Sequence, residues 1–516
     1  MRVPTPWRAV AVAVLVCASP AISSAQDTLA WSPYAPPTII ASQNGVLSTT
    51  LKTGASEVTL NGTKYNVNLY SGSLFPPVLK LQPGDELRLR LVNAMDTTLG
   101  TVGTVTNLHF HGFAVSPRQP ADDVIHTKVM LDSSYDYRVR LPADHAQGLF
   151  WYHPHNHGHS YDQVKAGMAG AITIGDPRRS FPQFAGTPEI FLLLKFFQPN
   201  NDDEITVVNG VPRVELPPMR VGEAQFWRIA NIAAERYYRL RLVDPAGDSV
   251  PFQVLARDGN VVAEGPPVMV SQVLLGAGQR LEAIVQGTRP GYYTLVATDF
   301  LRQDSTPDAR NPRIVDGAAV LARVRVYPAA AGNAMATVQG QRGGDPAEAR
   351  TIAALVAARP DSVVRDSIEF EVVRSDQPVQ YPIDHVNYNA DTISKRFALG
   401  QTYVWRIRNV SQSWHTFHLH QTDFLVDSIG GQAMPRDYRL DTVSVPPCTS
   451  FNPDFSCKRG AEGVAVIRFH YDRPETVGEF VYHCHMLFHQ DNGMMANALL
   501  GPDATGGTAT GRAHRH

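Results

Sequence analysis

Tyr482-His483-Cys484-His485-Met486-Leu487-Phe488-His489-Gln490-Asp491-Asn492-Gly493-Met494 is the stretch from which the rest of the chain is best interpreted. One cysteine lies between two histidines, a third histidine follows the cysteine by five residues, and a methionine follows it by ten. A thiolate, an imidazole and a weak thioether, joined by a second imidazole from elsewhere in a chain, form a blue-copper electron-transfer site. The stretch therefore predicts a mononuclear copper site.

The residues before this motif predict how its side chains are directed. Glu479-Phe480-Val481-Tyr482 is rich in β-branched and aromatic residues, so we expect a strand that continues through His483-Cys484-His485. Alternate side chains of a strand point to opposite faces. Cys484 would then face one metal while the two flanking histidines face others, which makes these three residues an electron relay between metal centres.

Length and composition set the broad class. A chain of 516 residues is too long for one core, and roughly two to four domains are expected. The 38 prolines and 39 glycines indicate many turns and favour β structure. With 46 basic and 48 acidic residues the net charge is −2, and without a basic stripe we expect no nucleic-acid partner.

The first residues predict export. A basic start, an apolar run over residues 9–18 and small residues before Gln26 are typical of a signal peptide over residues 1–25. An N-terminal anchor is the alternative, but the apolar run is too short for a stable membrane span. We expect a periplasmic or extracellular protein.

Three cysteines remain after the predicted signal peptide. Cys484 has the metal role, which leaves Cys448 and Cys457 on either side of a loop rich in Pro, Ser and Asn. An exported chain permits a disulfide between them that would pin this loop. Two free thiols are the alternative.

The chain repeats one unit three times. Nine residues separate a glycine from an asparagine, with an alternating strand pattern between them, in Gly84–Asn93, Gly222–Asn231 and Gly400–Asn409. The second half of the unit recurs as Gly148–His153, Gly291–Val296 and Gly478–His483. Three such repeats predict an all-β protein built from three β-sandwich domains. The expected ranges are 26–180, 181–330 and 365–502, with a linker over 331–364 that holds one short helix and a disordered tail over 503–516.

Superimposing the repeats assigns the metal ligands. The pair His109/His111 matches His418/His420, and the pair His153/His155 matches His483/His485. Cys484 falls on Pro154 and His415 on Thr106, so the first domain cannot hold a blue-copper site. Residues at i and i+2 of a strand share a face, so four such pairs can present eight imidazoles to three coppers between the first and third domains.

The middle unit carries no histidine at the matching positions, which hold Leu240, Leu242, Val296 and Thr298. We expect it to bind no copper and to act as a spacer. A single His-x-His pair is usually incidental, but four matched pairs beside the Cys484 motif are not.

The other histidines and methionines are weighed in the same way. His157 and His159 follow a ligand pair directly but lack a matching partner, so we treat them as non-ligands. The histidines that lack partner spacing are His126, His145, His385 and His470, and the tail holds His514 and His516. Met494 and Met495 are both candidate axial ligands, and Met494 is preferred because Gly493 provides the turn before it.

Together, the segments His109–Gly112, His153–His155, His415–His420 and His483–Met494 closely resemble the multicopper oxidases, above all the bacterial three-domain, laccase-like branch. The resemblance spans residues 40–500. It implies three cupredoxin-like β-sandwich domains of Greek-key type and four copper ions, one of type 1, one of type 2 and two of type 3.

Carried over residue by residue, the resemblance makes the type 1 ligands His415, Cys484, His489 and the axial Met494. The type 2 copper would be held by His109 and His418. One type 3 copper would be held by His111, His153 and His485, and the other by His155, His420 and His483.

Two positions depart from the family pattern. Thr416 stands where the family often has proline, which affects only the local loop. Gln490 stands where some bacterial members carry an acid that assists proton delivery. Asp491 is the candidate for that proton route here, and the pair Asp122 and Asp123 is the alternative.

The resemblance implies four one-electron oxidations of a phenol or aromatic amine coupled to reduction of dioxygen to water, by an enzyme that we expect to be a monomer. We expect the reductant to dock where an edge of His415 or His489 reaches the surface, near the Cys448–Cys457 loop and the face of the middle domain. A cuprous-ion oxidase is the alternative, although the chain has only 11 methionines and no methionine-rich cluster. A metal-free binding protein on the same fold and a copper nitrite reductase are further alternatives.

Overall fold

The computed structural model describes residues 30–99, 103–199, 204–262, 268–304, 313–330, 363–374 and 378–502, and these residues form an almost entirely β protein. The predicted signal peptide, most of the predicted linker with its short helix, and the predicted tail lie outside the described residues. Among the residues that the structure describes, no helix has the length and apolar character needed to cross a membrane.

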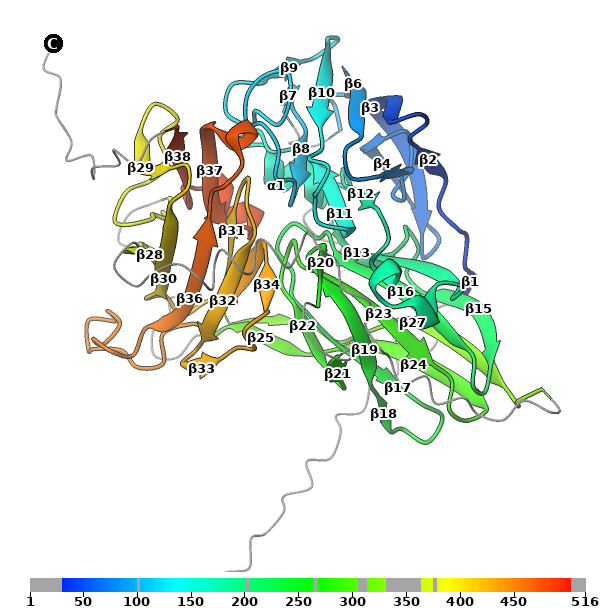
Figure 1. Ribbon diagram of the computed structural model, residues 1–516. Helices are drawn as coiled ribbons and strands as arrows, with labels where there is room; N and C mark the ends of the chain where they lie inside the picture. The colour runs from blue at the N-terminus through cyan, green and yellow to red at the C-terminus, as the bar shows by residue number, and fades with distance from the viewer. Residues whose placement is uncertain are drawn as a thin grey trace, which may run out of the picture.

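The first domain is a sandwich of two sheets (Figure 1). One sheet has the order β10 (Ser134–Arg140), β6 (Glu86–Ala94), β3 (Val46–Leu60) and β4 (Thr63–Tyr70). The other has the order β2 (Ile39–Ala41), β5 (Val78–Leu81), β12 (Gly170–Ile174), β11 (Gly148–His153) and β8 (His109–His111). Two short strands, β7 (Val105–Thr106) and β9 (Val129–Met130), pair beside them. Alternation explains the burial, since Leu87, Leu89 and Leu91 of β6 point into the core.

The middle domain has two larger sheets. One contains β1 (Ser32–Pro33), β15 (Val214–Arg220), β27 (Ala319–Tyr327), β24 (Gly291–Thr298), β17 (Tyr238–Val243) and β18 (Ser249–Val250), with β22 (Val273–Leu275) beside β17. The other contains β14 (Ile205–Val208), β13 (Glu189–Phe197), β16 (Ala224–Asn231), β23 (Arg280–Gln286), β19 (Phe252–Arg257) and β20 (Asn260–Val261), with β21 (Val268–Val270) beside β19. A hairpin of β25 (Phe300–Gln303) and β26 (Ile314–Asp316) completes it. Strand β1 precedes the first domain in sequence but belongs to a sheet of the middle domain.

The third domain repeats the plan of the first. One sheet contains β28 (Val363–Phe370), β30 (Thr402–Asn409), β36 (Gly463–His470), β32 (Phe424–Ile429) and β33 (Gln432–Ala433), with β34 (Arg439–Leu440) beside β32. The other contains β29 (Ile393–Ala398), β38 (Met495–Gly501), β37 (Gly478–Cys484), β31 (His415–Leu419) and β35 (Thr442–Val445). In the part of the chain that the structure describes, the helices are short: α1 (Ser160–Lys165), α3 (Leu487–Asp491) and the 3₁₀ turns at Pro177–Ser180, Pro182–Phe184 and Pro474–Thr476.

The repeated asparagine has the same task in all three domains, which confirms the predicted repetition. Nδ2 of Asn93, Asn231 and Asn409 donates in each case to a backbone carbonyl 4 to 11 residues further along the chain and to another 36 to 44 residues further along. Each Oδ1 accepts from the backbone N–H two residues on, at Met95 (3.3 Å), Ala233 (3.2 Å) and Ser411 (2.9 Å). The three-sandwich prediction is therefore correct, while its boundaries stay predictions.

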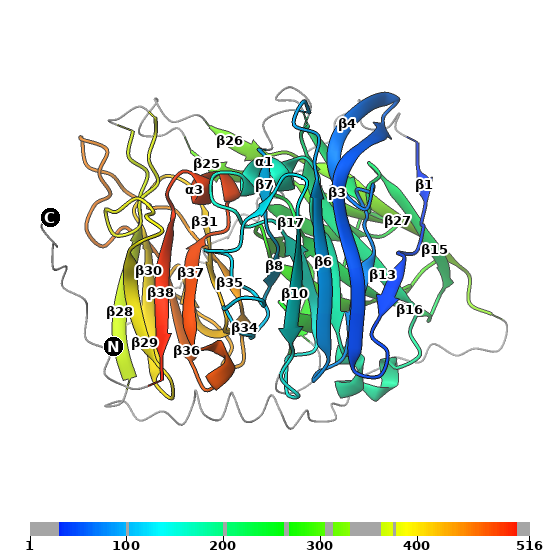
Figure 2. The same cartoon turned by 90° about the horizontal axis from the view of Figure 1, so that it is seen from above.

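The three domains pack against one another around α1 and α3, which lie side by side in Figure 2. One small apolar cluster draws a residue from each domain, namely Val164, Ala234 and Leu487. Tyr237, Ala277 and Phe300 of the middle domain join the core of the third. The interface between the first and third domains, where the histidine pairs were predicted to meet, is thus closed on one side by the middle domain.

Two local predictions need correction. Strand β37 ends at Cys484, and His485 lies in the bend after it, where its N–H donates to the Thr416 carbonyl (2.5 Å). His155 and His420 likewise lie just past the ends of β11 and β31, so only His109/His111 is a pair within one strand. The bends at Pro154 and after Leu419 still turn both members of each pair toward the same interface.

Candidate metal centres

A sulfur and two imidazoles meet where β37 ends, inside the core of the third domain. The Sγ atom of Cys484 lies 3.5 Å from Nδ1 of His415 and 3.8 Å from Nδ1 of His489, and these two nitrogens are 3.1 Å apart. His415 comes from β31 and His489 from α3, and all three side chains are buried. The structure thus brings together the three side chains predicted for the mononuclear site.

The chemistry of this group fits copper. Burial lowers the pKa of His415 to about 3 and that of His489 well below its usual value, so both rings are neutral lone-pair donors. Burial also raises the pKa of the Cys484 thiol to about 12, so a bound cation is needed to hold it as a thiolate at neutral pH. One soft sulfur and two neutral imidazoles suit copper.

Packing separates the two candidate axial methionines. Met494 is fully buried in the same apolar cluster as Cys484, and its carbonyl accepts the Cys484 N–H at 3.0 Å. Met495 packs in a different cluster, against Val124 and Val481. Met494 therefore lies on the side of the sulfur, although its role as a ligand stays a prediction.

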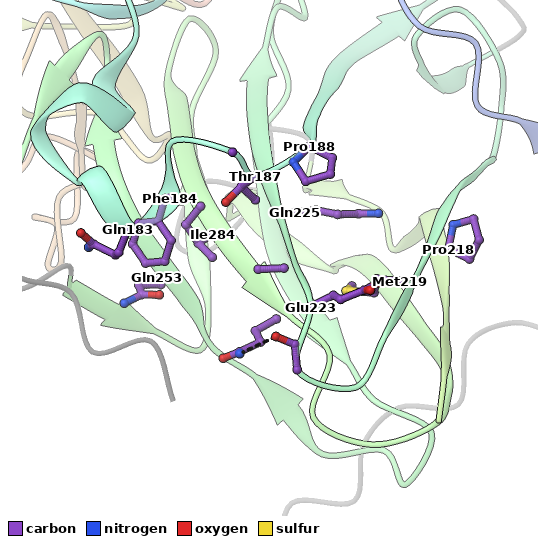
Figure 3. Close-up of a pocket in the computed structure, with 14 residues that line it drawn as sticks. Gln183, Phe184, Thr187, Pro188, Pro218, Met219, Glu223, Gln225, Gln253 and Ile284 are labelled. Atoms are coloured by element: carbon purple, nitrogen blue, oxygen red, sulfur yellow. Dashed lines mark hydrogen bonds between the residues drawn. The ribbon is translucent and has the colours of Figure 1, made fainter. Parts of the chain in front are cut away.

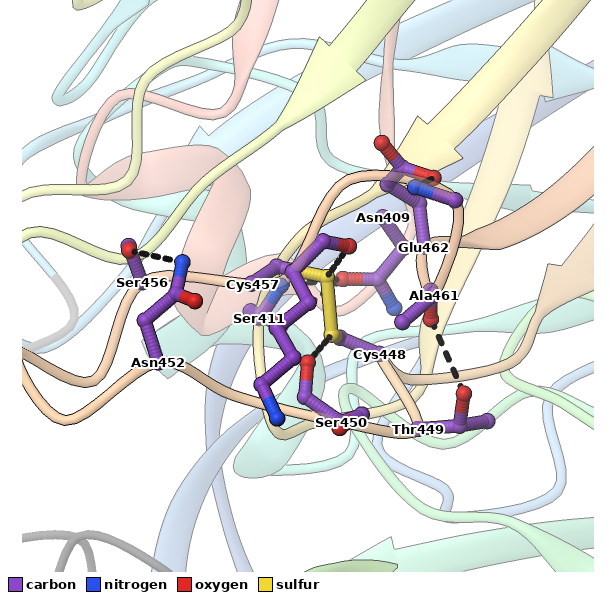
Figure 4. The surroundings of a disulfide bond; sticks show 12 residues. Asn409, Ser411, Cys448, Thr449, Ser450, Asn452, Ser456, Cys457, Ala461 and Glu462 are labelled. Carbon is purple, nitrogen blue, oxygen red and sulfur yellow. Dashed lines mark hydrogen bonds between the residues drawn. A yellow bond between two sulfur atoms is a disulfide. The ribbon is translucent and has the colours of Figure 1, made fainter.

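The segment before His415 orients its ring, and Figure 4 shows Asn409 and Ser411 of this segment beside the disulfide of Cys448 and Cys457. Nε2 of His415 lies 2.8 Å from the Ser411 hydroxyl, which lies 2.9 Å from Oδ1 of Asn409. The Ser411 carbonyl accepts the N–H of Cys448, and Cys448 is bonded to Cys457, which settles the open question about these cysteines. An Nε2–H that donates to Ser411 leaves Nδ1 of His415 free to bind a metal.

Eight imidazoles converge between the first and third domains. Two stacked ring pairs cross the interface, His109 on His420 with centroids 4.0 Å apart and His111 on His418 at 3.9 Å. All eight rings are buried, and burial is the main cause that lowers their pKa values below the usual range. The members are His109, His111, His153, His155, His418, His420, His483 and His485.

Outward nitrogens of these rings are held by hydrogen bonds. Nδ1 of His109 lies 3.0 Å from Asp122, Nδ1 of His153 lies 2.9 Å from the Pro154 carbonyl, and Nδ1 of His418 lies 2.7 Å from the Asp441 carbonyl. The opposite nitrogen of each of these three rings is buried and has no partner among the described residues. Buried nitrogens without a partner are unusual, and their convergence fits a set of metal donors.

Three of these rings share one point. Nε2 of His483 lies 3.1 Å from Nε2 of His155 and 3.2 Å from Nε2 of His420. This is the triad predicted for one type 3 copper. The other predicted triad has similar spacing, with the His485 ring centroid 4.9 Å from that of His111 and 5.4 Å from that of His153, against 4.8 and 5.3 Å from the His483 centroid to those of His155 and His420. The division of the eight rings among three metals stays a prediction.

The relay residues connect the two centres. In the antiparallel pairing of β31 with β37, Cys484 lies opposite Phe417 and His483 lies opposite His418. The sulfur points into the core of the third domain, whereas the His483 ring points into the interface. One peptide bond thus joins the mononuclear group to the eight imidazoles.

The candidate proton-route residues lie at different places. The Asp122 carboxylate contacts His109 and also accepts from the Phe110 N–H and the Gln421 amide. The Asp491 carboxylate accepts the backbone N–H groups of Gly158 and Tyr161, and so ties α3 to the first domain. A proton route through Asp491 stays a prediction, and of the three predicted carboxylates Asp122 is the one for which a contact with an interface imidazole is seen.

The histidines predicted to be non-ligands lie outside both groups. His157 packs against the Tyr388 ring, with centroids 4.6 Å apart, and His126 pairs with Asp123 at 3.2 Å. Nδ1 of His145 lies 2.9 Å from the carbonyl of Ala146. These local contacts account for their positions without a metal.

Sequence reasoning missed Asp441 and Thr442, which contact His111. The Asp441 Oδ1 atom and the Thr442 hydroxyl each lie 3.2 Å from Nε2 of His111. The sequence offered a signal, because the charged Asp441 stands between Leu440 and the β-branched pair Thr442-Val443, and a charged residue is buried only with a partner.

A pocket of about 470 Å³ opens beside the mononuclear group. Its walls come from the middle domain (Leu301, Arg302 and Asp304), the segment before His415 (Gln412 and Trp414) and the disulfide loop (Pro447, Cys448, Thr449, Ser450 and Phe451). It lies beside the disulfide loop and the middle domain, where the reductant was predicted to dock, but the rings of His415 and His489 are both buried, so the expected exposed ring edge is not found. A second pocket of about 470 Å³ lies within the middle domain (Figure 3), where glutamines such as Gln183 and Gln253 line it and no histidine or cysteine does.

Comparisons with known proteins agree with these groups. A family model described as multicopper oxidase matches residues 363–504, and a second model with the same description matches residues 52–179. Together they cover just over half of the chain and leave out the middle domain. A multicopper oxidase of Staphylococcus haemolyticus is 21% identical over 474 residues, which is 88% of each chain. A laccase of Haloferax volcanii is 25% identical over 435 residues, 78% of this chain and 68% of that one.

Solved structures share the fold. A multicopper oxidase from Campylobacter jejuni, described as a metallo-oxidase, superimposes with a TM-score of 0.71 at 20% identity over 92% of this chain and 96% of that one. A laccase-like multicopper oxidase from Ochrobactrum sp., described as active toward lignin model compounds, superimposes with a TM-score of 0.67. It is 22% identical, and the match covers 91% of this chain and 100% of that one. The described domains are accordingly cupredoxin-like.

Proposed function

Because this chain belongs to the multicopper oxidase family, and is thus a copper-dependent oxidoreductase that uses dioxygen, we propose that it oxidises phenols or aromatic amines. The observation that carries the proposal is the juxtaposition of the Cys484 group with the eight imidazoles through one peptide bond. This arrangement lets a reductant be oxidised at one place while oxygen is reduced at another.

The side chains would divide four coppers between them. His415, Cys484, His489 and Met494 would hold the type 1 copper, and the eight interface imidazoles would hold the other three. Copper bound there supplies one-electron oxidation at the first centre and the four-electron reduction of oxygen to water at the second. Burial of both groups among apolar side chains excludes bulk water. The Asp122 carboxylate contacts Nδ1 of His109 and would hold a proton at that nitrogen.

The pocket beside His415 would receive the reductant. Trp414 directly precedes this ligand and lines the pocket together with Phe451, so an aromatic ring can pack there. Among the described residues that line it there is no methionine, which favours a phenol or an aromatic amine over Cu(I). The pocket within the middle domain has no lining residue in the third domain and offers no path to either metal group.

A cuprous-ion oxidase is the second candidate. The relative from Campylobacter jejuni that is described as a metallo-oxidase favours it. A metal-free binding protein is not favoured, because every predicted ligand position carries its donor and the donors converge.

The chain would work outside the cytoplasm and as a single copy. The Cys448–Cys457 disulfide supports export, since such bonds persist in oxidising compartments. Both donor groups are complete within one chain, so no second copy is required.

Oxygen uptake by the copper-loaded protein tests the proposal. Initial rates would be compared for a phenol, an aromatic amine and Cu(I), and a faster rate with either organic reductant is expected. A strong preference for Cu(I) would replace the proposal by the second candidate, and absence of uptake with all three would overturn both.

Two substitutions locate the reductant. We expect Phe451→Ala to raise KM for the phenol about tenfold while leaving the blue absorption unchanged, because the substitution removes an aromatic wall. Gln183→Ala, in the pocket of the middle domain, is the matched control and should not change KM. Equal effects of the two substitutions would place the reductant elsewhere.

A further inference from the structure

A charged side chain of the middle domain, that of Arg280, lies at the edge of the group of eight imidazoles. Arg280, the first residue of β23, is fully buried, and its two terminal nitrogens donate to the two carboxylate oxygens of Asp441 at 2.7 and 2.6 Å. A bidentate pair of this kind fixes the orientation of a carboxylate. Arg280 itself is fixed, because its backbone N–H donates to Asp258 at 2.7 Å and Nη1 donates to the Gly278 carbonyl at 3.1 Å.

Asp441 carries this constraint to two of the imidazoles. Its Oδ1 lies 3.2 Å from Nε2 of His111, and its backbone carbonyl accepts from Nδ1 of His418 at 2.7 Å. The Thr442 hydroxyl donates to the same Oδ1 at 2.9 Å and lies 3.2 Å from the His111 nitrogen. With Nε2–H of His111 held by Asp441, its partnerless Nδ1 points to the interior as a lone-pair donor.

The same strand also holds the first domain. Nε of Arg280 donates to the Leu149 carbonyl at 3.0 Å, and Oε2 of Glu282 accepts the Leu149 N–H at 2.8 Å. Leu149 lies in β11, which leads directly to His153. Both polar groups of one residue in a ligand-bearing strand are therefore held by two alternate residues of β23.

The loop before Arg280 touches the rings themselves. A Cβ atom at Gly278 would lie 3.2 Å from Cδ2 of His485 and 3.3 Å from Cε1 of His111. The positive φ of +89° and this close approach both favour glycine at that position. The middle domain thus packs directly on the imidazoles rather than only separating the outer domains.

We propose that Arg280 is a positioning residue of the three-copper centre: it holds Asp441, and through it His111 and His418, in the orientation that binds metal. The middle domain, which supplies no imidazole, would then complete the centre, in place of the simple spacer expected from the sequence. The inference rests on the proposed copper-binding role of the eight rings.

Copper affinity tests the inference without reference to turnover. Apo-protein of the wild type and of Arg280→Met would be titrated with copper against a chelator, with the blue absorption reporting the mononuclear site and the type 2 electron paramagnetic resonance signal reporting the cluster. We expect the cluster to bind copper about 10–100-fold more weakly in the variant, as for other residues that orient metal ligands, with unchanged affinity at the blue site.

Three further variants separate positioning from general stability. Thr442→Val removes a hydroxyl contact to His111 without removing a buried charge, so it should fold and weaken the cluster in the same direction by a smaller factor. Arg280→Lys keeps the charge but not the two-pronged contact, and an intermediate affinity is expected. Arg473→Gln breaks the Arg473–Asp144 bridge (2.6 Å) between the third and first domains far from the rings, and should leave copper binding unchanged.

The outcomes are distinct. Cluster affinity within twofold of the wild type in both Arg280→Met and Thr442→Val would overturn the inference, as would an equal loss at both copper sites. A wild type that binds no copper would instead overturn the proposed function.

Discussion

The first and third domains share a strand scaffold but differ in what they place at one end of it. In the first, β11 pairs with β8 so that His153 lies opposite His109; in the third, β37 pairs with β31 so that His483 lies opposite His418. The register is identical, and both domains supply two imidazole pairs to their interface. The shared centre is therefore a property of the repeated scaffold.

The two domains differ in the side chains on the opposite face of these strands. The position of His415 is taken by Thr106 in the first domain, whose hydroxyl donates to the side-chain Oε1 atom of Gln163 at 2.8 Å. The position of Cys484 is taken by Pro154, which has no sulfur, although its carbonyl contacts Nδ1 of His153 (2.9 Å) just as the Cys484 carbonyl contacts Nδ1 of His483 (3.1 Å). In the first domain, the neutral and mutually hydrogen-bonded side chains of Thr106 and Gln163 thus occupy the place that metal donors occupy in the third. A few substitutions on one face of a common scaffold thus decide whether a domain has a metal site of its own.

Replacing Cys484 by Ser makes the third domain resemble the first and has the largest expected effect. The blue absorption should vanish and reductant-driven oxygen uptake should fall by at least about 10³-fold, because the relay to the interface is broken. The melting temperature of the apo-protein should hardly change, since serine fits the same space. Retained uptake would contradict the proposed relay.

Replacing His420 by Gln instead removes one imidazole from the centre that the first and third domains share. His420 is one of three rings whose Nε2 atoms meet within 3.2 Å, so one type 3 position loses a donor. We expect the blue colour to form, to bleach with reductant and to fail to return in air, with uptake reduced by about 10²-fold or more.

The matched control for this variant is His157→Gln, in a neighbouring segment. Its ring packs on Tyr388 and is not a predicted ligand. Reoxidation in air should proceed as in the wild type, and a block equal to that of His420→Gln would assign His157 to the cluster.

Replacing Met494 by Leu sharpens what distinguishes the third domain. Loss of a weak axial donor should raise the reduction potential of the blue site by on the order of 60 mV, the change that accompanies a tenfold shift in a one-electron equilibrium. Met495→Leu is the control, because Met495 packs against Val481 in a separate cluster. The reduction potential of each variant would be measured by spectroelectrochemical titration. A potential that changed in Met495→Leu but not in Met494→Leu would make Met495 the axial ligand instead.

Replacing Ser411 by Ala should give the smallest shift. Its hydroxyl, 2.8 Å from Nε2 of His415, makes that ring a stronger donor, so its loss should raise the potential by about 30 mV or less. Ser444→Ala, whose hydroxyl contacts Gln279 rather than a predicted ligand, should leave the potential unchanged. Equal shifts in the two variants would show that the serine does not act through His415.

The sequence was sufficient for the parts that repeat. The glycine-to-asparagine units predicted the three sandwiches, and the spacing around His109, His153, His418 and His483 predicted which rings would meet. Periodic patterns of this kind report strand faces directly. They could not predict where β37 would end, because a one-residue change in strand length leaves the pattern almost the same.

Contacts between domains were beyond the sequence. Arg280 and Asp441 are 161 residues apart, and a single buried pair leaves no periodic trace. The same holds for the pocket walls, which arise only when the disulfide loop meets the middle domain. The middle domain was consequently expected to be a spacer, whereas its loop at Gly278 lies against the rings.

The copper-to-protein ratio at saturation tests the central claim most directly. One mononuclear site in the third domain and one shared three-metal centre should give a ratio of four for the wild type and three for Cys484→Ser, with the blue band lost together with the missing copper. Equal ratios in the two proteins, or a wild-type ratio of one or less, would contradict the two-centre arrangement.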